Sequence, residues 1–235
     1  MIYPYQKIIP FDFGDSNDNG VLSENVSALG PLNLNICKGI NFTSNNQFPI
    51  VSPYNGAIPN GLCSVHRLSK KQESFLNNLG GIFFTKDSNF EAYWTHPYKY
   101  LPFLRKFQCI LSTDFSLYTN MLLIQKIWNS FRNKLMSAFY QRNSIPLIPA
   151  PSWGDLKYID LYMEGWPTNS IIAINSTGIG KDKRCRHIWL DGYHAMLDIL
   201  KPVYILRYGS MIEGEITEIS KFYPNNNKPD FRYGS

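Results

Sequence analysis

Short apolar segments alternate with longer amphipathic ones between residues 81 and 220. In the long segments at about 120–141 and 182–200, apolar residues recur every three or four positions, which predicts helices. Ile124, Trp128 and Phe131 share one face of the first helix, and this face is predicted to lie in the core. The short segments predict five β-strands, namely GIFFTKD, QCILSTD, IPLIPA, SIIAINST and PVYILRY.

This alternation of strands and helices predicts an α/β fold built from parallel βα units. The strands are almost continuously apolar, as expected of a mostly parallel sheet that is covered on both faces. Five strands are too few to close an eight-stranded barrel. An open sheet and a partial, TIM-like barrel therefore both fit the pattern.

The regions outside this alternation differ in composition. Residues 1–80 are rich in Asn, Pro, Gly and Ser, which favour turns, yet aromatic and aliphatic residues are scattered throughout. We expect an irregular N-terminal segment that packs on the α/β domain of residues 81–220. The polar residues 221–235 are expected to form a flexible tail.

Composition and charge narrow the functional classes. The 235 residues carry a net charge of +5, which permits an anionic partner without requiring one. The sequence holds no apolar run of about 20 residues and no signal-peptide pattern, so we expect a cytoplasmic protein that does not enter a membrane. Its four cysteines form no CxxC pair, which favours free thiols over a zinc site.

Polar residues follow the predicted strands, and the carboxyl ends of parallel strands lie at one edge of a sheet, where ligands bind. Three acids at this edge could act in acid-base catalysis or hold a divalent metal through their oxygen atoms. Each could instead cap a following helix. The candidate catalytic residues are Asp87, Asp114 and Asp155.

The segment NSTGIGKDKRCRH, at 175–187, joins the end of a predicted strand to the start of a predicted helix. Backbone N–H groups at a helix start attract anions, and its basic residues are unfavourable there unless an anion binds. A solvated basic loop is the alternative. The candidate phosphate-binding residues are Ser176, Thr177, Gly178, Gly180, Lys181, Lys183, Arg184 and Arg186.

Aromatic residues complete the predicted site. Trp153 follows a strand and could stack on a base or sugar, or could instead cover the edge of the sheet. Tyr208 ends the last predicted strand and could line the same cavity. Arg132 and Arg207 fall within helix and strand patterns, so burial would require an acidic partner, for which Asp114 or Asp155 is expected.

Five segments together resemble a known family: FFTKDSNFEAYW, ILSTDFSLYTNM, IWNSFRNKLMSAFYQ, IPLIPAPSWGD and MEGWPTNSIIAINSTGIG. They occur in the same order in the domain of unknown function 4417 family of bacteria, phages and mobile elements. The resemblance covers about residues 81–209. The family usually has two adjacent acids where Lys86 precedes Asp87 here, and Pro where this chain has Thr113. The resemblance implies a mobile-element setting and brings no established activity.

The sequence leaves two functions open. The strand-end edge could bind a nucleotide or a nucleic-acid strand and could hydrolyse it, with or without a divalent metal. Alternatively, the protein could be a non-catalytic factor that binds a host or phage protein through aromatic contacts.

Overall fold

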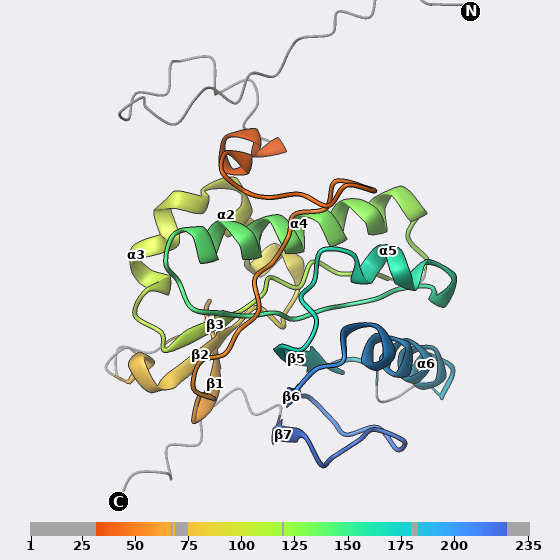
Figure 1. Ribbon diagram of the computed structural model, residues 1–235. Coiled ribbons are helices and arrows are strands. Elements are labelled where there is room, and N and C mark those ends of the chain that lie inside the picture. The colour runs from red at the N-terminus through yellow and green to blue at the C-terminus, as the bar shows by residue number, and fades with distance from the viewer. Residues whose placement is uncertain (1–31, 67, 69–74, 119, 180–182, 225–235) are drawn as a thin grey trace, which may run out of the picture.

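The computed structural model describes residues 32–66, 68, 75–118, 120–179 and 183–224, and the strands of these residues form two parallel sheets (Figure 1). The first sheet contains, in spatial order, β1 (Gly61–Ser64), β2 (Leu79–Ile82), β3 (Cys109–Leu111) and β4 (Leu147–Ile148). The second contains β5 (Ile171–Asn175), β6 (Tyr204–Tyr208) and β7 (Ser220–Tyr223). The predicted α/β class with parallel strands is confirmed.

The two sheets approach each other at both of their edges. On one side, the N–H of Ala173 in β5 donates to the carbonyl oxygen of Pro149, just beyond β4, at 2.8 Å. On the other side, the Tyr223 hydroxyl and the Lys221 ammonium of β7 both donate to the carbonyl of Pro59, just before β1. The described strands do not pair across these two places, so the sheets form a partial barrel.

Alternate side chains of the strands fill a common interior, as the two-residue period of a strand requires. Burying each large side chain there stabilises the fold by about 1.5–3 kcal/mol. This interior cluster consists of Tyr54, Leu62, Ile82, Phe84, Cys109, Leu111, Ile148, Ala150, Ala173, Leu206, Tyr208 and Tyr223.

The remaining strand side chains, such as Ile110, Leu147 and Ile172, face outward and pack against helices. The α-helices are α2 (Glu91–Thr95), α3 (Leu101–Leu104), α4 (Leu123–Arg142), α5 (Ile159–Met163) and α6 (Lys183–Leu200). Short 3-10 helices are η2 (Leu34–Cys37), η3 (Leu76–Asn78), η4 (Asp87–Asn89), η5 (Pro97–Tyr100) and η6 (Leu156–Tyr158). Among the described helices, none combines the length and the apolar character that crossing a bilayer requires.

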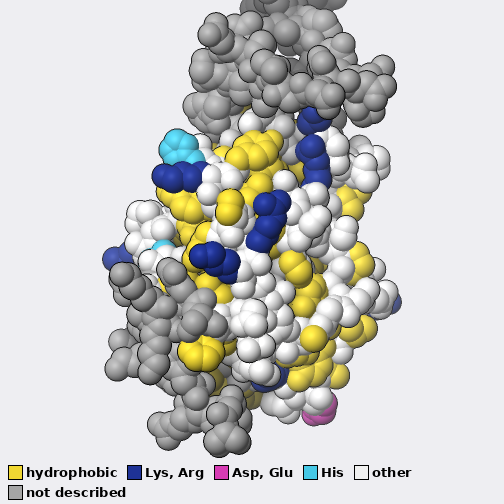
Figure 2. Space-filling view, turned by 90° about the vertical axis from the view of Figure 1, so that its left-hand side faces the viewer, with side chains coloured by type: hydrophobic (Ala, Val, Ile, Leu, Met, Phe, Trp, Pro, Cys, Tyr) yellow, Lys and Arg dark blue, Asp and Glu magenta, His cyan; other side chains and the backbone are white. Residues whose placement is uncertain are grey.

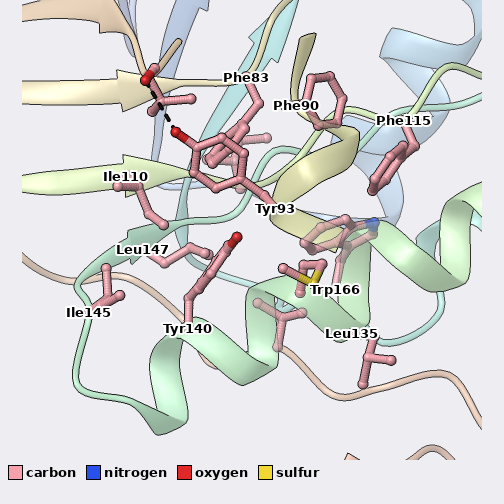
Figure 3. Packing of buried hydrophobic residues seen from close by; sticks show 14 of the residues in the cluster. Phe83, Phe90, Tyr93, Ile110, Phe115, Leu135, Tyr140, Ile145, Leu147 and Trp166 are labelled. Atoms are coloured by element: carbon pink, nitrogen blue, oxygen red, sulfur yellow. Dashed lines mark hydrogen bonds between the residues drawn. The ribbon is translucent and has the colours of Figure 1, made fainter. Parts of the chain in front are cut away.

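Figure 3 shows the packing between the sheet and the helices. Tyr140 of α4 lies beside Leu147 and points toward Tyr93, with Ile110 and Phe83 close by, whereas Leu135 lies elsewhere on the same helix. The ring of Phe83 meets that of Tyr93 edge to face at 5.2 Å between centroids. Such aromatic pairs contribute about 0.5–1.5 kcal/mol beyond the burial of their area.

The N-terminal half of α4 departs from the predicted apolar core face. Ile124 is 68% exposed and Trp128 is 36% exposed, while Phe131 is only half-buried. The buried residues of this half are instead the polar Lys126, Asn129 and Ser130. The second half buries both polar and apolar residues, namely Asn133, Lys134, Leu135, Met136, Ser137, Ala138, Phe139 and Tyr140. The prediction that Trp128 lies in the core was therefore wrong, and the reason is the set of hydrogen bonds described below.

Lys134 illustrates how these buried polar residues are accommodated. Its side chain is fully buried, and its ammonium group donates to the Ser130 hydroxyl at 2.6 Å and to the Tyr162 carbonyl at 2.9 Å. The ammonium also lies 4.3 Å from the centre of the Phe48 ring. Burial lowers the pKa of Lys134 to about 7, although the charge of Glu164 acts in the opposite direction.

The expected N-terminal segment and tail fall only partly within the described residues. Residues 1–31 and 225–235 lie outside them. Residues 32–66 contact the strands, for example through the Tyr54 N–H, which donates to Ser170 Oγ at 2.9 Å. This part also supplies β1.

Candidate functional site

The carboxyl ends of the described strands form an edge that we call the rim. It comprises residues 85–87 after β2, 112–116 after β3, 149–155 after β4, 175–179 at and after β5, and 208–210 at and after β6. The strands run parallel within each sheet, and the hydrogen bond from Asn175 at the end of β5 to Asp114 after β3 places the carboxyl ends of both sheets at the same end of the partial barrel.

Asp114 is the rim residue whose acid-base properties depart most clearly from ordinary values. Burial raises its pKa from 3.8 to about 6; a hydrogen bond from Asn175 opposes this rise, and the charge of Asp87 adds to it. The bond runs from Asn175 Nδ2 to Asp114 Oδ2 at 3.2 Å. A carboxyl group that titrates near pH 6 can donate or accept a proton near neutral pH.

Asn175 joins Asp114 to the segment after β5. Its Oδ1 accepts a hydrogen bond from the N–H of Thr177 at 2.8 Å, while its Nδ2 donates to Asp114. One amide side chain therefore fixes the distance between the candidate acid and the candidate phosphate-binding turn. Asn175 was not predicted as a site residue, because nothing in the sequence distinguishes it from the many Asn residues that occur in turns after strands.

Asp87 lies close to Asp114 but has a different set of contacts. Its carboxylate accepts hydrogen bonds from the N–H and the hydroxyl of Ser116, the latter at 2.7 Å. These bonds tie the segment after β2 to the segment after β3. The structure thus brings two of the three predicted acids into one neighbourhood.

Thr113 contributes a buried polar group beside Asp114. The residue is fully buried, and its hydroxyl finds no hydrogen-bond partner among the described residues. Cys109 and Leu111 face the interior of the partial barrel, and the strand period directs Thr113 to the same side. Leaving such a group unpaired costs about 1–3 kcal/mol.

Asp155 is held elsewhere on the rim. Its carboxylate accepts a hydrogen bond from the ammonium of Lys126 on α4 at 2.9 Å, and Lys126 is 2% exposed. Asp155 precedes η6, but its side chain makes no capping hydrogen bond. Its contact with Lys126 places a negative charge beside a buried positive one, and no described contact joins it to Asp114.

The predicted phosphate-binding segment is only partly described. The Ser176 hydroxyl donates to the carbonyl of Ser210 at 2.6 Å, whereas Thr177 is exposed. Gly178 has a φ of +87°, and a side chain added there would meet nothing within 4 Å. Arg186 is exposed on α6. Gly180 and Lys181, as well as the side chains of Lys183 and Arg184, lie outside the described residues.

The two predicted aromatic residues occupy different positions. The Trp153 indole N–H donates to the Trp189 carbonyl at 3.1 Å, so Trp153 lies against α6 and remains partly exposed. A Cβ on Gly192 would come within 2.2 Å of the Trp153 ring, so this contact requires glycine. Tyr208 is buried, and its ring packs 5.4 Å from that of Phe84 beneath the rim.

Buried asparagines of α4 hold the segment that carries Asp114. Asn133 Oδ1 accepts from the N–H of Phe115 at 2.8 Å, and Asn133 Nδ2 donates to the carbonyl of the same residue at 3.2 Å. Asn129 Nδ2 donates to the Ser116 carbonyl at 2.7 Å. In the sequence, these residues form a polar stripe on the side of the helix opposite the apolar residues. Amphipathicity alone would predict that this polar stripe faces solvent.

The two arginines have partners other than those expected. Arg132 pairs with Glu91 at 2.9 Å, and Arg207 pairs with Glu215. The expectation that Asp114 or Asp155 would neutralise them was wrong. Asp114 is oriented by Asn175, and Asp155 pairs with Lys126, whereas Glu215 approaches Arg207 from the loop just after β6.

We expect Asn133→Ala to destabilise the protein by about 2–4 kcal/mol, because it leaves both backbone groups of Phe115 buried without partners. Chemical denaturation would measure the free energy of unfolding. Gln141 on the same helix is a matched control, since it makes the same pair of bonds to Ser52, but at an exposed position. Gln141→Ala should cost less than about 1 kcal/mol because water can replace it. Equal losses in the two variants would contradict the role of Asn133.

A cleft of about 560 Å³ lies away from the rim. It is lined by Asn46, by α5 and the following residues, and by the end of α6. The Glu164 carboxylate at its edge accepts hydrogen bonds from Asn46 and Thr43. Within the described residues, no group of three or more His, Cys, Asp or Glu could hold a metal ion, in this cleft or at the rim.

Comparison with known proteins identifies a family and two similar phage proteins. The model of a family described as a domain of unknown function (DUF4417) matches residues 44–223. The chain is also 32% identical over 129 residues to the Gene 1 protein of Mycobacterium phage L5. This alignment covers 55% of this chain and 56% of the phage protein.

A second phage protein is similar over the same length. The Gene 1 protein of Mycobacterium phage D29 is 30% identical over 129 residues, covering 55% of this chain and 48% of that protein. The chain thus aligns with about half the length of these curated relatives. No solved structure is significantly similar to it.

Proposed function

This chain belongs to the DUF4417 family and is similar to two phage proteins, and from that premise we propose that it binds a phosphorylated ligand at the rim. The ligand is a nucleotide or a nucleic-acid strand. The reaction that fits the rim best is hydrolysis of a phosphoester, with Asp114 as the residue that transfers a proton.

The observation that carries this proposal is the state of Asp114. Its pKa near 6 leaves both protonation states accessible close to neutral pH. In its acid form the carboxyl group can give a proton to a leaving oxygen, and in its base form it can accept one from an attacking water. Asn175 holds the carboxyl group in place.

The phosphate side of the proposal rests on residues just beyond Asn175. Thr177 is exposed and is held by Asn175, and Arg186 is exposed on the helix that follows. The sequence between them adds Lys181, Lys183 and Arg184. Positive charge close to an exposed turn attracts a phosphate group, and the affinity it provides falls as salt rises.

A second candidate is binding to a host or phage protein without catalysis. It is favoured by the exposed apolar residues at the start of α4, since Leu122 and Ile124 are each 68% exposed and Tyr118 is 58% exposed. Exposed apolar groups of this kind commonly mark protein interfaces. The two candidates differ in whether small phosphorylated compounds bind the isolated protein.

The test uses fluorescently labelled ATP, a single-stranded oligonucleotide and a duplex, each titrated at low salt. Changing Lys183, Arg184 and Arg186 to Ala should weaken binding about tenfold or more and should lower its salt dependence, because each phosphate contact contributes to both. The control variant Lys201→Ala removes an exposed charge close to the amino end of β6, at the opposite end of that strand from the rim. If the wild-type chain binds none of the three probes, the proposal is wrong.

A further inference from the structure

A group of exposed basic side chains lies at the end of the molecule opposite the rim. Arg105 and Lys106 shortly precede β3, and Arg142 shortly precedes β4, so they lie near the amino ends of these strands. Lys99 belongs to η5. We call Lys38, Lys99, Arg105, Lys106 and Arg142 the basic face.

Other observations place these residues together. A Cβ on Gly39 would lie 3.4 Å from the Arg142 side chain, which brings Lys38 and Arg142 into one area. Arg105 donates to the carbonyl of Asn143, the residue after Arg142, at 3.2 Å. In Figure 2, which views this side, Lys and Arg side chains lie among apolar ones, and acidic side chains appear only at the lower edge.

The positive charge of this face is not neutralised within the described residues. None of the five residues has an ion-pair partner there. Asp114 is the sole acid in the sequence between Glu91 and Asp155, and it lies at the rim. Like charges that gather without acids repel one another, so a negatively charged segment would bind to them favourably.

Exposed apolar groups accompany the basic residues. Tyr98, next to Lys99, is 48% exposed, and its ring meets that of Phe139 edge to face at 5.1 Å. Leu32, where the described residues begin, is 49% exposed. The face therefore combines charge with apolar surface, which suits a partner that is both acidic and aromatic.

The preceding part of the chain joins the domain on this side. Asn33, which follows Leu32, donates its side-chain N–H to the Trp94 carbonyl at 2.7 Å, and Trp94 lies just before η5. Residues 1–31 are thus connected to the domain close to Tyr98 and Lys99. At about 3.3 Å per extended residue, they are long enough to reach every part of the basic face.

The composition of residues 1–31 complements the basic face. This segment contains four acids and one base, so its charge is opposite to that of the face. Its acids are Asp12, Asp15, Asp18 and Glu24, its base is Lys7, and its apolar residues include Ile2, Tyr3, Tyr5, Ile8, Ile9, Phe11 and Phe13.

We propose that residues 1–31 bind back onto the basic face of the same chain. The acids at 12, 15 and 18 pair with the basic side chains, and the aromatic and aliphatic residues that precede them cover Tyr98 and Leu32. This inference is independent of the function proposed for the rim, because the two lie at opposite ends of the strands.

Hydrogen exchange of the full chain, followed by mass spectrometry, tests the proposal. At low salt, residues 1–31 should exchange about tenfold or more slowly than an unprotected chain, because binding closes their backbone to water. Changing Asp12, Asp15 and Asp18 to Asn should remove most of this protection, and so should Lys99→Gln combined with Arg105→Gln and Arg142→Gln. The control, Lys157→Gln combined with Arg186→Gln, removes exposed charges elsewhere and should leave it unchanged.

Charge exchange gives a sharper version of the test. A chain with Asp12, Asp15 and Asp18 changed to Lys should lose protection, and adding Lys99→Glu, Arg105→Glu and Arg142→Glu should restore it. Unprotected exchange of residues 1–31 in the wild type would overturn the proposal. So would protection that increases with protein concentration, which would indicate binding to a second copy.

Discussion

Replacing Glu215 by Ala is expected to destabilise the protein by about 3–5 kcal/mol, because the positive charge of Arg207 would stay buried without its partner. The two side chains are 2% and 3% exposed. Arg207 Nη2 donates to Glu215 Oε1 at 2.6 Å, and the same oxygen accepts from the N–H of Ile212. Denaturant unfolding would measure the loss in free energy of unfolding. The slope of this free energy against denaturant concentration would check for two-state behaviour.

Two variants control this experiment. Glu213→Ala removes an exposed acid from the same loop and should change stability by less than about 0.5 kcal/mol. The double variant Arg207→Met with Glu215→Leu replaces both charges by apolar groups and should recover only part of the loss. No charge is then buried, but the backbone groups of Tyr208, Ser210 and Ile212 lose their hydrogen-bond partners. A loss below about 1 kcal/mol in the Ala variant would mean that water reaches Arg207.

The pair also determines the shape of the rim. Arg207 donates to the carbonyls of Tyr208 and Ser210, each at 2.6 Å. Ser176 in turn donates its hydroxyl to the Ser210 carbonyl, so the segments after β5 and β6 are joined through one residue. The loss of Glu215 should therefore disturb ligand binding at the rim as well as stability.

The sequence predicts much of the fold because the period of apolar residues reports local structure. The five predicted strands correspond to β2 through β6, and the two long helices correspond to α4 and α6. β1 and β7 were not predicted. Each has four residues, and Lys221 of β7 interrupts the apolar pattern because its ammonium reaches the Pro59 carbonyl. A strand of this length is identified mainly by the neighbouring strand with which it pairs, and that strand lies far away in the sequence.

The roles of the rim residues also depend on partners that lie far away in the sequence. The parallel topology correctly predicts that Asp87, Asp114 and Thr177 lie at one edge. The hydrogen bonds that distinguish their roles join residues 29 to 61 positions apart, such as Ser116 with Asp87 and Asn175 with Asp114. The polar side of α4 misleads for a related reason. Periodicity separates the two faces of a helix, but the backbone of Phe115 and Ser116 decides which face is buried.

Asp114→Asn is expected to abolish the proposed hydrolysis while making the folded protein more stable at neutral pH. Removing a group that transfers a proton lowers turnover about 10²–10⁴-fold. The amide of the variant can still accept the hydrogen bond from Asn175, so the rim should keep its shape. Ser116→Ala, which removes a hydroxyl bonded to Asp87, is a control that should leave turnover within about tenfold if Asp114 carries the chemistry.

The pH dependence of stability separates a catalytic Asp114 from a structural one. Its folded-state pKa of about 6 lies above the ordinary value of 3.8, so the folded state binds the proton more tightly than the unfolded state between these values. The stability that the protonated carboxyl group provides is present below pH 3.8 and is lost as pH rises through 6. Above that pH the charge destabilises the folded state, by about 1–3 kcal/mol for a shift of this size.

The Asn variant should thus gain stability relative to wild type between pH 4 and pH 6 and keep the advantage up to pH 8. Because Lys134 titrates in both chains, its contribution cancels in the difference. A variant less stable than wild type throughout this range would make Asp114 a structural residue and remove the main support for catalysis at the rim.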